Sequence, residues 1–357
     1  MAIELFRGIA ALMVMVYHYA ISFFPGTPLG IAYLRTGVDL FFVISGYVFG
    51  PMLLRDFGAQ QNGSHYALLP FWLRRFFRIY PLYLLALVAY FLFAAPGELR
   101  THYFLRHLAF LQTTESLQEA SYFNDAFWTL PVEMEFYLAL PLLALLRKRP
   151  LLLVALSAAS LMLAFYATSH LSGTINFWFI LSVHLPSILP EFMLGALLAA
   201  MVAHGRAQGW RWYAPPALWA LGSGVVLLLG AYYLRFGPGG SGYGLMVHSP
   251  WNFLCASGYV LLMFPVLLCD EIRWPLWLRQ VALLAGASSY GVYLFHNVVR
   301  LVLTQAEFSD SPALLIPLAM ILTVALSLLL YHFYEGPLRR LGRKLARWAE
   351  RGEVGPP

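Results

Sequence analysis

The chain opens with a long apolar segment, residues 4–24, which reads ELFRGIAALMVMVYHYAISFF. Apart from Glu4, the only residues in it that are charged or titrate near neutral pH are Arg7 and His18, eleven positions apart. On a helix this spacing returns the chain to within about 20° of its starting direction, so both side chains share one face, roughly 16 Å apart along the axis. A charge inside a bilayer is costly and usually faces the protein interior or a substrate path. The segment therefore predicts a membrane-spanning helix that carries part of a chemical site.

The composition of the whole chain agrees with a membrane setting. Hydrophobic residues make up 60% of the sequence, charged residues only 11%, and the mean hydropathy is +0.68. These values exclude an ordinary soluble protein. Since a span needs about 20 residues, a chain of 357 residues has room for about ten spans. We expect the first apolar run to be retained, because no basic stretch precedes it and no small-residue cleavage site ends it.

The pattern predicts an all-α integral membrane protein with about ten transmembrane helices around a central polar cavity or tunnel. The predicted spans are residues 4–24, 36–55, 79–95, 127–146, 150–168, 177–203, 214–234, 252–270, 281–305 and 312–334. The stretch 102–112 is apolar but short, which favours a re-entrant or interfacial element. With a cytoplasmic N-terminus, eighteen of the 23 lysine and arginine residues fall on the cytoplasmic side. The positive-inside rule then places both termini in the cytoplasm.

The hydropathy and charge pattern also predicts the domain organisation. We expect residues 1–338 to form one transmembrane domain and residues 339–357 to form a basic cytoplasmic tail. Clustered lysine and arginine beside a span is typical of adhesion to anionic inner-leaflet lipid. The expected location is the inner (plasma) membrane of a bacterial-type cell, crossed many times.

Depth along the predicted helices connects residues that are far apart in the sequence. At about 1.5 Å per residue, His18, Asp39, Glu133, Glu135 and His296 all fall in the outer half of the bilayer at overlapping depth. Buried histidines and carboxylates at one level can pair, and pairing offsets much of their desolvation cost. The two glutamates, two positions apart on a helix, cannot face the same way. One is expected in the site and the other in packing.

Some of these residues have structural alternatives. A lone histidine in a membrane, such as His296, often hydrogen-bonds a neighbouring helix. Asp39 lies near the start of its predicted helix, where it can cap the helix or orient a histidine. Arg75 and Arg78 stand at i and i+3 and are expected to project together at the cytoplasmic surface. Arginine forks suit phosphate oxygens, whereas the plain alternative is a snorkelling anchor.

Several segments together resemble the membrane acyltransferase-3 family. The matching features are Arg7 followed by His18, residues 37–46 (GVDLFFVISG), the pair Arg75 and Arg78, residues 128–137 (WTLPVEMEFY), residues 289–296 (SYGVYLFH) and residues 334–337 (YEGP). They occur in the family's order over nearly the whole chain. Thr129 stands where the family usually has serine, and the soluble hydrolase-like domain that some members carry is not seen.

The resemblance implies transfer of an acyl group, commonly acetyl from acetyl-CoA, to a hydroxyl of a glycan, a lipid-linked sugar or another small acceptor. It assigns catalysis to His18, favours Glu133 as the site glutamate and gives the arginine pair a role at the acyl donor. We therefore expect three groups of site residues. They are His18, Asp39 and Glu133 for catalysis, Arg7, Arg75 and Arg78 for acyl-CoA, and Tyr137, Tyr290 and His296 for the substrate.

In this scheme His18 acts as general base or as an acyl-carrying nucleophile. Expected partners are acyl-CoA, the hydroxyl acceptor and membrane lipids, and no metal or nucleic acid is expected, because the ligand spacing of a metal site is missing. The rival class is a secondary transporter or proton-coupled carrier, which also has broken helices and buried histidines. No paired halves are visible in the sequence, and this favours the enzyme.

Overall fold

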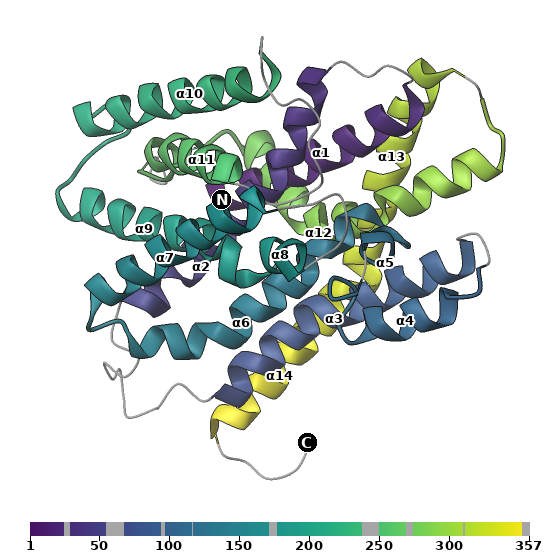
Figure 1. The fold of residues 1–357 in the computed structure, drawn as a ribbon, viewed down its shortest axis with the longest axis horizontal. Coiled ribbons are helices and arrows are strands. Elements are labelled where there is room, and N and C mark those ends of the chain that lie inside the picture. Colours follow the sequence, from purple (N-terminus) through teal and green to yellow (C-terminus); the bar gives the residue numbers. More distant parts are fainter. Residues whose placement is uncertain are drawn as a thin grey trace.

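The computed structural model describes residues 1–24, 29–54, 68–93, 97–115, 117–170, 177–237, 250–268, 274–309 and 311–351. Throughout these ranges the secondary structure is helical and contains no strand (Figure 1). The prediction of an all-α membrane protein is confirmed.

Ten helices occupy the expected spans in the described residues. They are α1 (Ala2–Phe23), α2 (Gly37–Leu54), α3 (Leu68–Phe93), α6 (Thr129–Leu145), α7 (Pro150–Ser169), α9 (Leu185–Ala207), α10 (Pro215–Phe236), α11 (Pro250–Leu268), α12 (Leu276–Gln305) and α13 (Pro312–Leu330). Shorter elements join them: η1 (Leu29–Thr36), α4 (Arg100–Leu108), α5 (Leu117–Ser121), η2 (Asp125–Trp128), α8 (Phe177–Ser182), η3 (Tyr331–Glu335) and α14 (Gly336–Arg351). The stretch expected to be re-entrant or interfacial, 102–112, overlaps the short helix α4.

Nine helical segments of the described chain are long and apolar enough to cross a membrane, and α12 is not among them. It carries His296 and Asn297, both buried, in its middle. A helix surrounded by other helices does not need an apolar surface all round, because its polar groups meet protein partners instead of lipid. With 30 residues, α12 has the length to cross the bilayer.

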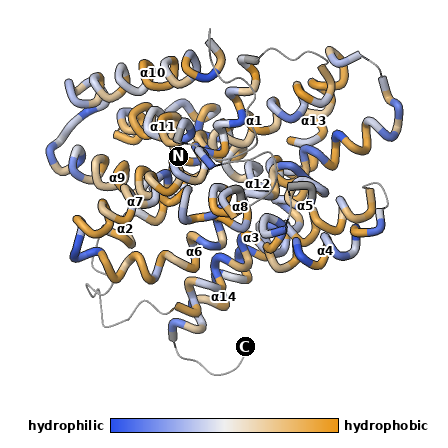
Figure 2. Tube along the Cα trace, in the orientation of Figure 1, coloured by the Kyte–Doolittle hydropathy of each residue, from blue (hydrophilic) through white to orange (hydrophobic). Residues whose placement is uncertain are grey.

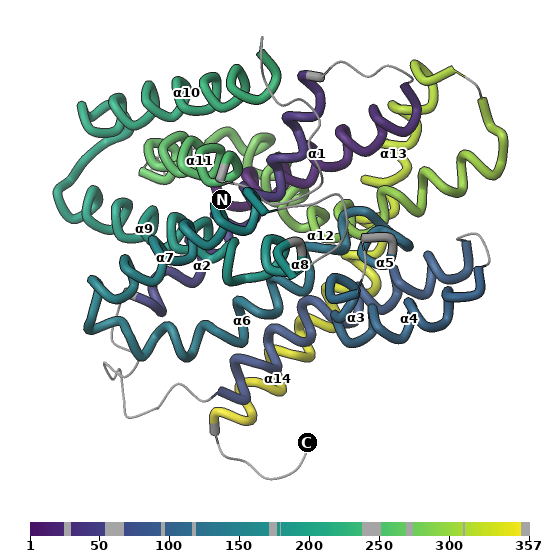
Figure 3. Tube along the Cα trace, in the orientation of Figure 1, coloured from purple at the N-terminus to yellow at the C-terminus, as the bar shows by residue number. Residues whose placement is uncertain are grey.

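The helices that build the centre come from both ends of the chain. Helix α1 packs along α12, and α2 packs along α9 (Figure 1). The long helices are coloured as apolar over most of their length, with hydrophilic residues gathered near many of their ends (Figure 2). In the tube view, the early helix α3 and the last helix α14 run side by side (Figure 3).

The contact between α2 and α9 depends on two glycines that face each other. A Cβ on Gly46 would collide with the backbone carbonyl of Phe192, and one on Gly195 would collide with the carbonyl of Val43. Small residues at a crossing let two helix backbones approach closely, which is a common way to pack helices in membranes. This crossing holds α2, which carries Asp39, in a fixed position.

The α3 region differs most from the prediction. Helix α3 begins at Leu68 rather than at residue 79, so Arg75 and Arg78 lie within the helix. The helix continues through Pro81, as helices in membranes can when neighbours satisfy the freed backbone groups.

Residues 339–351, expected to begin a basic tail, belong to α14, which packs antiparallel on α3. Arg74 donates to Glu350 at 2.7 Å, and Gly342 lies against Phe77. Residues 352–357 lie outside the described ranges.

Candidate active site

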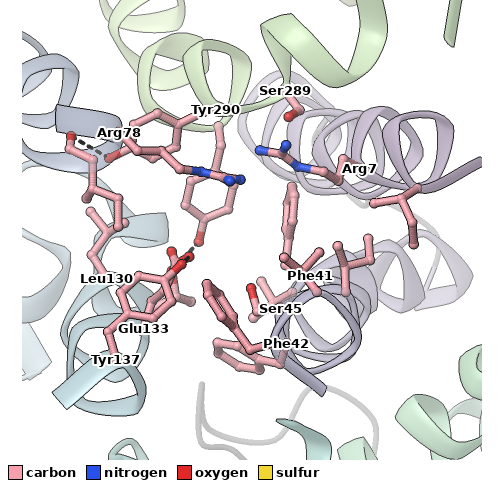
Figure 4. Close-up of a pocket in the computed structure, with 18 of the residues that line it drawn as sticks. Arg7, Phe41, Phe42, Ser45, Arg78, Leu130, Glu133, Tyr137, Ser289 and Tyr290 are labelled. Carbon is pink, nitrogen blue, oxygen red and sulfur yellow. Dashed lines mark hydrogen bonds between the residues drawn. The ribbon is translucent and has the colours of Figure 1, made fainter. Parts of the chain in front are cut away.

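A cavity of about 200 Å³, here called cavity 1, lies between α1, α2, α3, α6 and α12 (Figure 4). Arg7 from α1 and Arg78 from α3 both extend into it, and their guanidinium groups point toward each other. Arg7 is paired with Glu4 at 3.5 Å, whereas Arg78 forms no side-chain hydrogen bond or ion pair with another residue of the described chain. The Arg78 guanidinium can therefore bind the oxygens of an anion.

The opposite wall of cavity 1 carries Glu133 and Tyr137, one turn apart on α6 (Figure 4). The Tyr137 hydroxyl donates a hydrogen bond to Glu133. Tyr290 also lines the cavity, and its hydroxyl donates to the carbonyl of Ile79 on α3 at 3.0 Å. The predicted substrate residues Tyr137 and Tyr290 are therefore brought together with the predicted site glutamate.

Arg75 does not share this cavity with Arg78. Its guanidinium carbon lies 4.9 Å from the centre of the Phe49 ring and 5.8 Å from that of Tyr137. It packs behind the two rings that line cavity 1. The expectation that Arg75 and Arg78 project together at one surface therefore differs from the structure. The reason is that residues three apart on a helix diverge by about 60°, enough to place one in the cavity and the other among aromatic rings.

A second and smaller cavity of about 40 Å³, cavity 2, contains His18 and Asp39. Its lining residues come from α1, η1, the start of α2, η2 and α11: Val14, Tyr17, His18, Arg35, Val38, Asp39, Asp125, Ala126, Trp128 and Asn252. Asp39, only 1% exposed, accepts hydrogen bonds from the Asn252 amide at 3.0 and 3.1 Å, one to each carboxylate oxygen. His18 and Asp39 therefore line the same cavity.

The direct partner of His18 is His296 of α12, with 2.9 Å between His18 Nδ1 and His296 Nε2. His296 Nδ1 lies 3.1 Å from the carbonyl oxygen of Val292, which can only accept, so this nitrogen carries the proton. In a neutral ring the other nitrogen, Nε2, then accepts, and His18 Nδ1 must donate to it. His18 is left with an unprotonated Nε2, the form that a general base or a nucleophile requires.

His296 lines neither cavity and is completely buried. It therefore supports His18 from behind. Its predicted role as a substrate-binding residue has no support in this position, whereas the alternative of a hydrogen bond to a neighbouring helix agrees with it.

Glu133 is in cavity 1 with Arg7, and not in cavity 2 with His18. Glu133 was expected nearer the outer surface, because its predicted span begins at residue 127. In the structure η2 precedes α6, and its residues Asp125 and Trp128 are already at the level of His18. Glu133, further along, therefore falls at the arginine end.

The other glutamate of the pair has the packing role expected for one of the two. Glu135 accepts from the backbone N–H of Leu185 at 2.8 Å and bonds the His184 ring, which ties α6 to the start of α9. Two small residues of α1 serve packing: Gly8 lies against Ala285, and Ala11 belongs to a core cluster with Met15.

Cavity 2 also contains residues that the sequence reading did not select, namely Arg35, Asp125, Trp128 and Asn252. A buried network holds the η2 segment in place: Asn297 donates to Asn124 Oδ1 at 2.8 Å, and the same oxygen caps the backbone N–H of Ala126 at 2.9 Å. Polar residues near the ends of the predicted spans could have indicated this part of the site, but span ends are the least certain part of such a prediction. Among the described residues, no three histidine, cysteine, aspartate or glutamate side chains are grouped as metal ligands.

The fold and the two cavities define a multi-pass membrane protein with a histidine site inside the bundle. Comparison with known proteins gives its family: the acyltransferase-3 family model, described as an acyltransferase domain, matches residues 2–332, and the chain belongs to this family. The chain is similar to the O-acetyltransferase OatA of Staphylococcus aureus strain NCTC 8325, with 24% identity over 95% of this chain and 57% of that protein. OatA of strain COL shows the same identity and coverage.

The chain spans somewhat more than half the length of these curated relatives, 57%. No solved structure matches it.

Proposed function

We propose that the protein transfers an acyl group, commonly acetyl, from acyl-CoA to a hydroxyl of a glycan, a lipid-linked sugar or another small acceptor in the inner membrane of a bacterial-type cell. The observation that carries this proposal is the protonation form of His18, whose Nε2 is unprotonated. His18 lines cavity 2, which adjoins the arginine-lined cavity 1. The family assignment and the O-acetyltransferase names of the relatives favour it over a transporter.

Cavity 1 fits the anionic part of the donor. Arg7 and Arg78 converge there from different helices, and guanidinium groups bind phosphate oxygens with two parallel hydrogen bonds. The mostly apolar remainder of the lining suits a slender thioester-carrying arm. Arg75 contributes by supporting Tyr137 and Phe49, which line the cavity.

Cavity 2 fits the acceptor hydroxyl. It combines His18 with Asp39, Asn252, Asp125 and Arg35, which can hydrogen-bond hydroxyl groups, and with Tyr17 and Trp128, which can cover the apolar face of a ring. A few convergent polar groups among aromatic rings are typical of small-molecule sites.

The reaction then follows from ordinary acyl-transfer chemistry. The acceptor oxygen attacks the thioester carbonyl carbon, His18 Nε2 takes the hydroxyl proton, the carbon–sulfur bond breaks, and that proton passes to the CoA sulfur. In the covalent alternative, Nε2 itself attacks the carbonyl carbon and CoA leaves as the thiolate. The acceptor oxygen then attacks the acyl carbon, the neutral imidazole leaves, and the hydroxyl proton passes to the CoA sulfur. In both cases the Nδ1–H bond to His296 stabilises the charged ring.

The decisive experiment compares cells with the wild-type protein, with His18→Ala and without the protein. Mass spectrometry of surface glycans should find acyl esters only with the wild type. We expect His18→Ala to lose transfer by about 10²–10⁴-fold while its membrane insertion, followed by immunoblot, stays normal. If His18→Ala kept more than about a tenth of the transfer, catalysis worth that factor could not reside there.

A further inference from the structure

Val38 is the one residue of the described chain that lines both cavities. It is the second residue of α2, directly before Asp39. Thr129 and Tyr293 line cavity 1 beside it, and Val14 and Trp128 line cavity 2. The side chain of Val38 therefore stands at the boundary between the arginine-lined space and the space that holds His18.

The backbone at this boundary is held tightly. A Cβ on the preceding residue, Gly37, would come within 2.6 Å of the Ala10 carbonyl and 3.1 Å of Val14. The start of α2 thus lies directly against α1, which also carries His18. A β-branched side chain on a helix has one strongly preferred rotamer, so Val38 presents a fixed obstacle.

The space beyond Val38 is small. Cavity 2 measures about 40 Å³, against about 200 Å³ for cavity 1. Because this smaller space must also take the acceptor hydroxyl, each methylene added to an acetyl group is harder to accommodate beyond Val38.

We propose that Val38 selects the length of the acyl group, restricting the donor to acetyl. This inference rests on the proposed function and adds the specificity-determining residue. The donor arm occupies cavity 1, and only its acyl end passes Val38 to meet His18 and the acceptor hydroxyl. There the acceptor oxygen bonds to the acyl carbon, the carbon–sulfur bond breaks, and the hydroxyl proton travels through His18 to the CoA sulfur. A longer acyl chain cannot place its carbonyl carbon beside His18.

The test is an internal competition in inside-out membrane vesicles that contain the full-length protein and its natural acceptors. The vesicles receive equal concentrations of acetyl-, propionyl- and butyryl-CoA, and mild base then releases the esters for mass spectrometry. The ratio of products reports relative kcat/KM and does not depend on the identity of the acceptor. We expect the wild type to prefer acetyl over butyryl by about 10-fold or more, the scale set by added methylenes in a tight pocket.

Val38→Ala removes the obstacle and should lower this preference by about 10-fold or more. The matched control is Val43→Ala, which removes the same atoms from the same helix at a buried position that lines neither cavity. The control should keep the wild-type ratio. A wild type that transfers butyryl as readily as acetyl would overturn the proposal, as would equal ratios in the two alanine variants.

Val38→Phe tests the same boundary in the opposite direction. It should retain acetyl-CoA binding, measured by calorimetry on the purified protein, but lose transfer. Loss of binding along with transfer would assign Val38 to the donor cavity alone and overturn the inference. If transfer by the wild type is absent with all three donors, the proposed function itself fails; if acetyl transfer occurs without any effect of Val38, only the inference fails.

Discussion

The hydrogen bond between His18 and His296 is the residue-scale feature on which the chemistry depends. Each ring has a single role because the Val292 carbonyl accepts a hydrogen bond from His296 Nδ1–H. Tyr19 secures the same turn, since its hydroxyl donates to the backbone carbonyl of His296 at 2.8 Å. A partner that fixes the tautomer of a working histidine usually matters almost as much as the histidine itself.

Replacement of His296 should separate the positioning role from substrate binding. We expect His296→Leu, which removes the acceptor for His18, to lower kcat by about 10–100-fold and to leave KM for acetyl-CoA unchanged. His296→Gln supplies an amide oxygen and should recover part of the loss. Steady-state kinetics of vesicles with acetyl-CoA checks this, and a rise in KM with an unchanged kcat would instead support a substrate-binding role.

The arginines give a second prediction at this scale. Arg78→Ala should weaken acetyl-CoA binding by about 1.5–3 kcal/mol, the value of a hydrogen bond to a charged group, and should not change the unfolding temperature. Lysine at this position should restore binding only in part, because it keeps the charge and loses the fork. Calorimetry and thermal unfolding of the purified protein measure the two effects.

Arg75→Ala serves as the comparison. It should lower the unfolding temperature as well as the affinity, because its guanidinium packs on the Phe49 and Tyr137 rings. Identical behaviour of the two alanine variants in both measurements would contradict the different positions assigned to these arginines.

At the scale of elements, the site depends on how closely the helices approach. Helix α2 provides Val38 and Asp39, and it is held between α1, which Gly37 contacts, and α9, which Gly46 contacts. Helix α12 provides His296 and lies against α1, with Ala285 filling the space above Gly8. Small residues at each crossing therefore set the separation of the side chains that react.

Gly46→Ala tests this dependence. The added methyl group meets the Phe192 backbone, and overpacking of this kind costs about 1–3 kcal/mol, so we expect a lower unfolding temperature in detergent. The matched control is Gly222→Ala on α10, where a Cβ would meet no atom within 4 Å. That variant should unfold at the wild-type temperature or above, and equal destabilisation of both would show that the crossing is not the cause.

At the scale of the whole molecule, orientation decides which cavity faces which compartment. The excess of lysine and arginine on one side predicts a cytoplasmic N-terminus and C-terminus. Arg7 and Arg78 would then lie toward the cytoplasm, where acyl-CoA is present, and His18 would lie deeper. Helix α14 continues on the side of the bundle where α3 begins.

Reporter fusions check this orientation. Green fluorescent protein fused after Arg351 should fluoresce, because it folds in the cytoplasm. Alkaline phosphatase fused after Glu307, beyond the end of α12, should be active, because it would be exported. The opposite pattern at both positions would reverse the molecule in the membrane and remove the reason to place the donor in cavity 1.

The sequence by itself determined the class of protein, the positions of the long helices and the shared face of Arg7 and His18. These are local properties: hydropathy over about 20 residues defines a span, and a regular helix relates residues eleven positions apart without help from any neighbour. Even α12 could be predicted, although its polar residues keep it outside the apolar set.

Only the tertiary structure decided which of these residues meet. Depth along a helix can be counted from the sequence, but its rotation and its crossing with other helices cannot. The partner of His18 is therefore a second histidine, Glu133 lies with the arginines, and Val38 divides the two cavities. Each of these contacts joins elements far apart in the chain, and each depends on close packing of small residues that no single segment specifies.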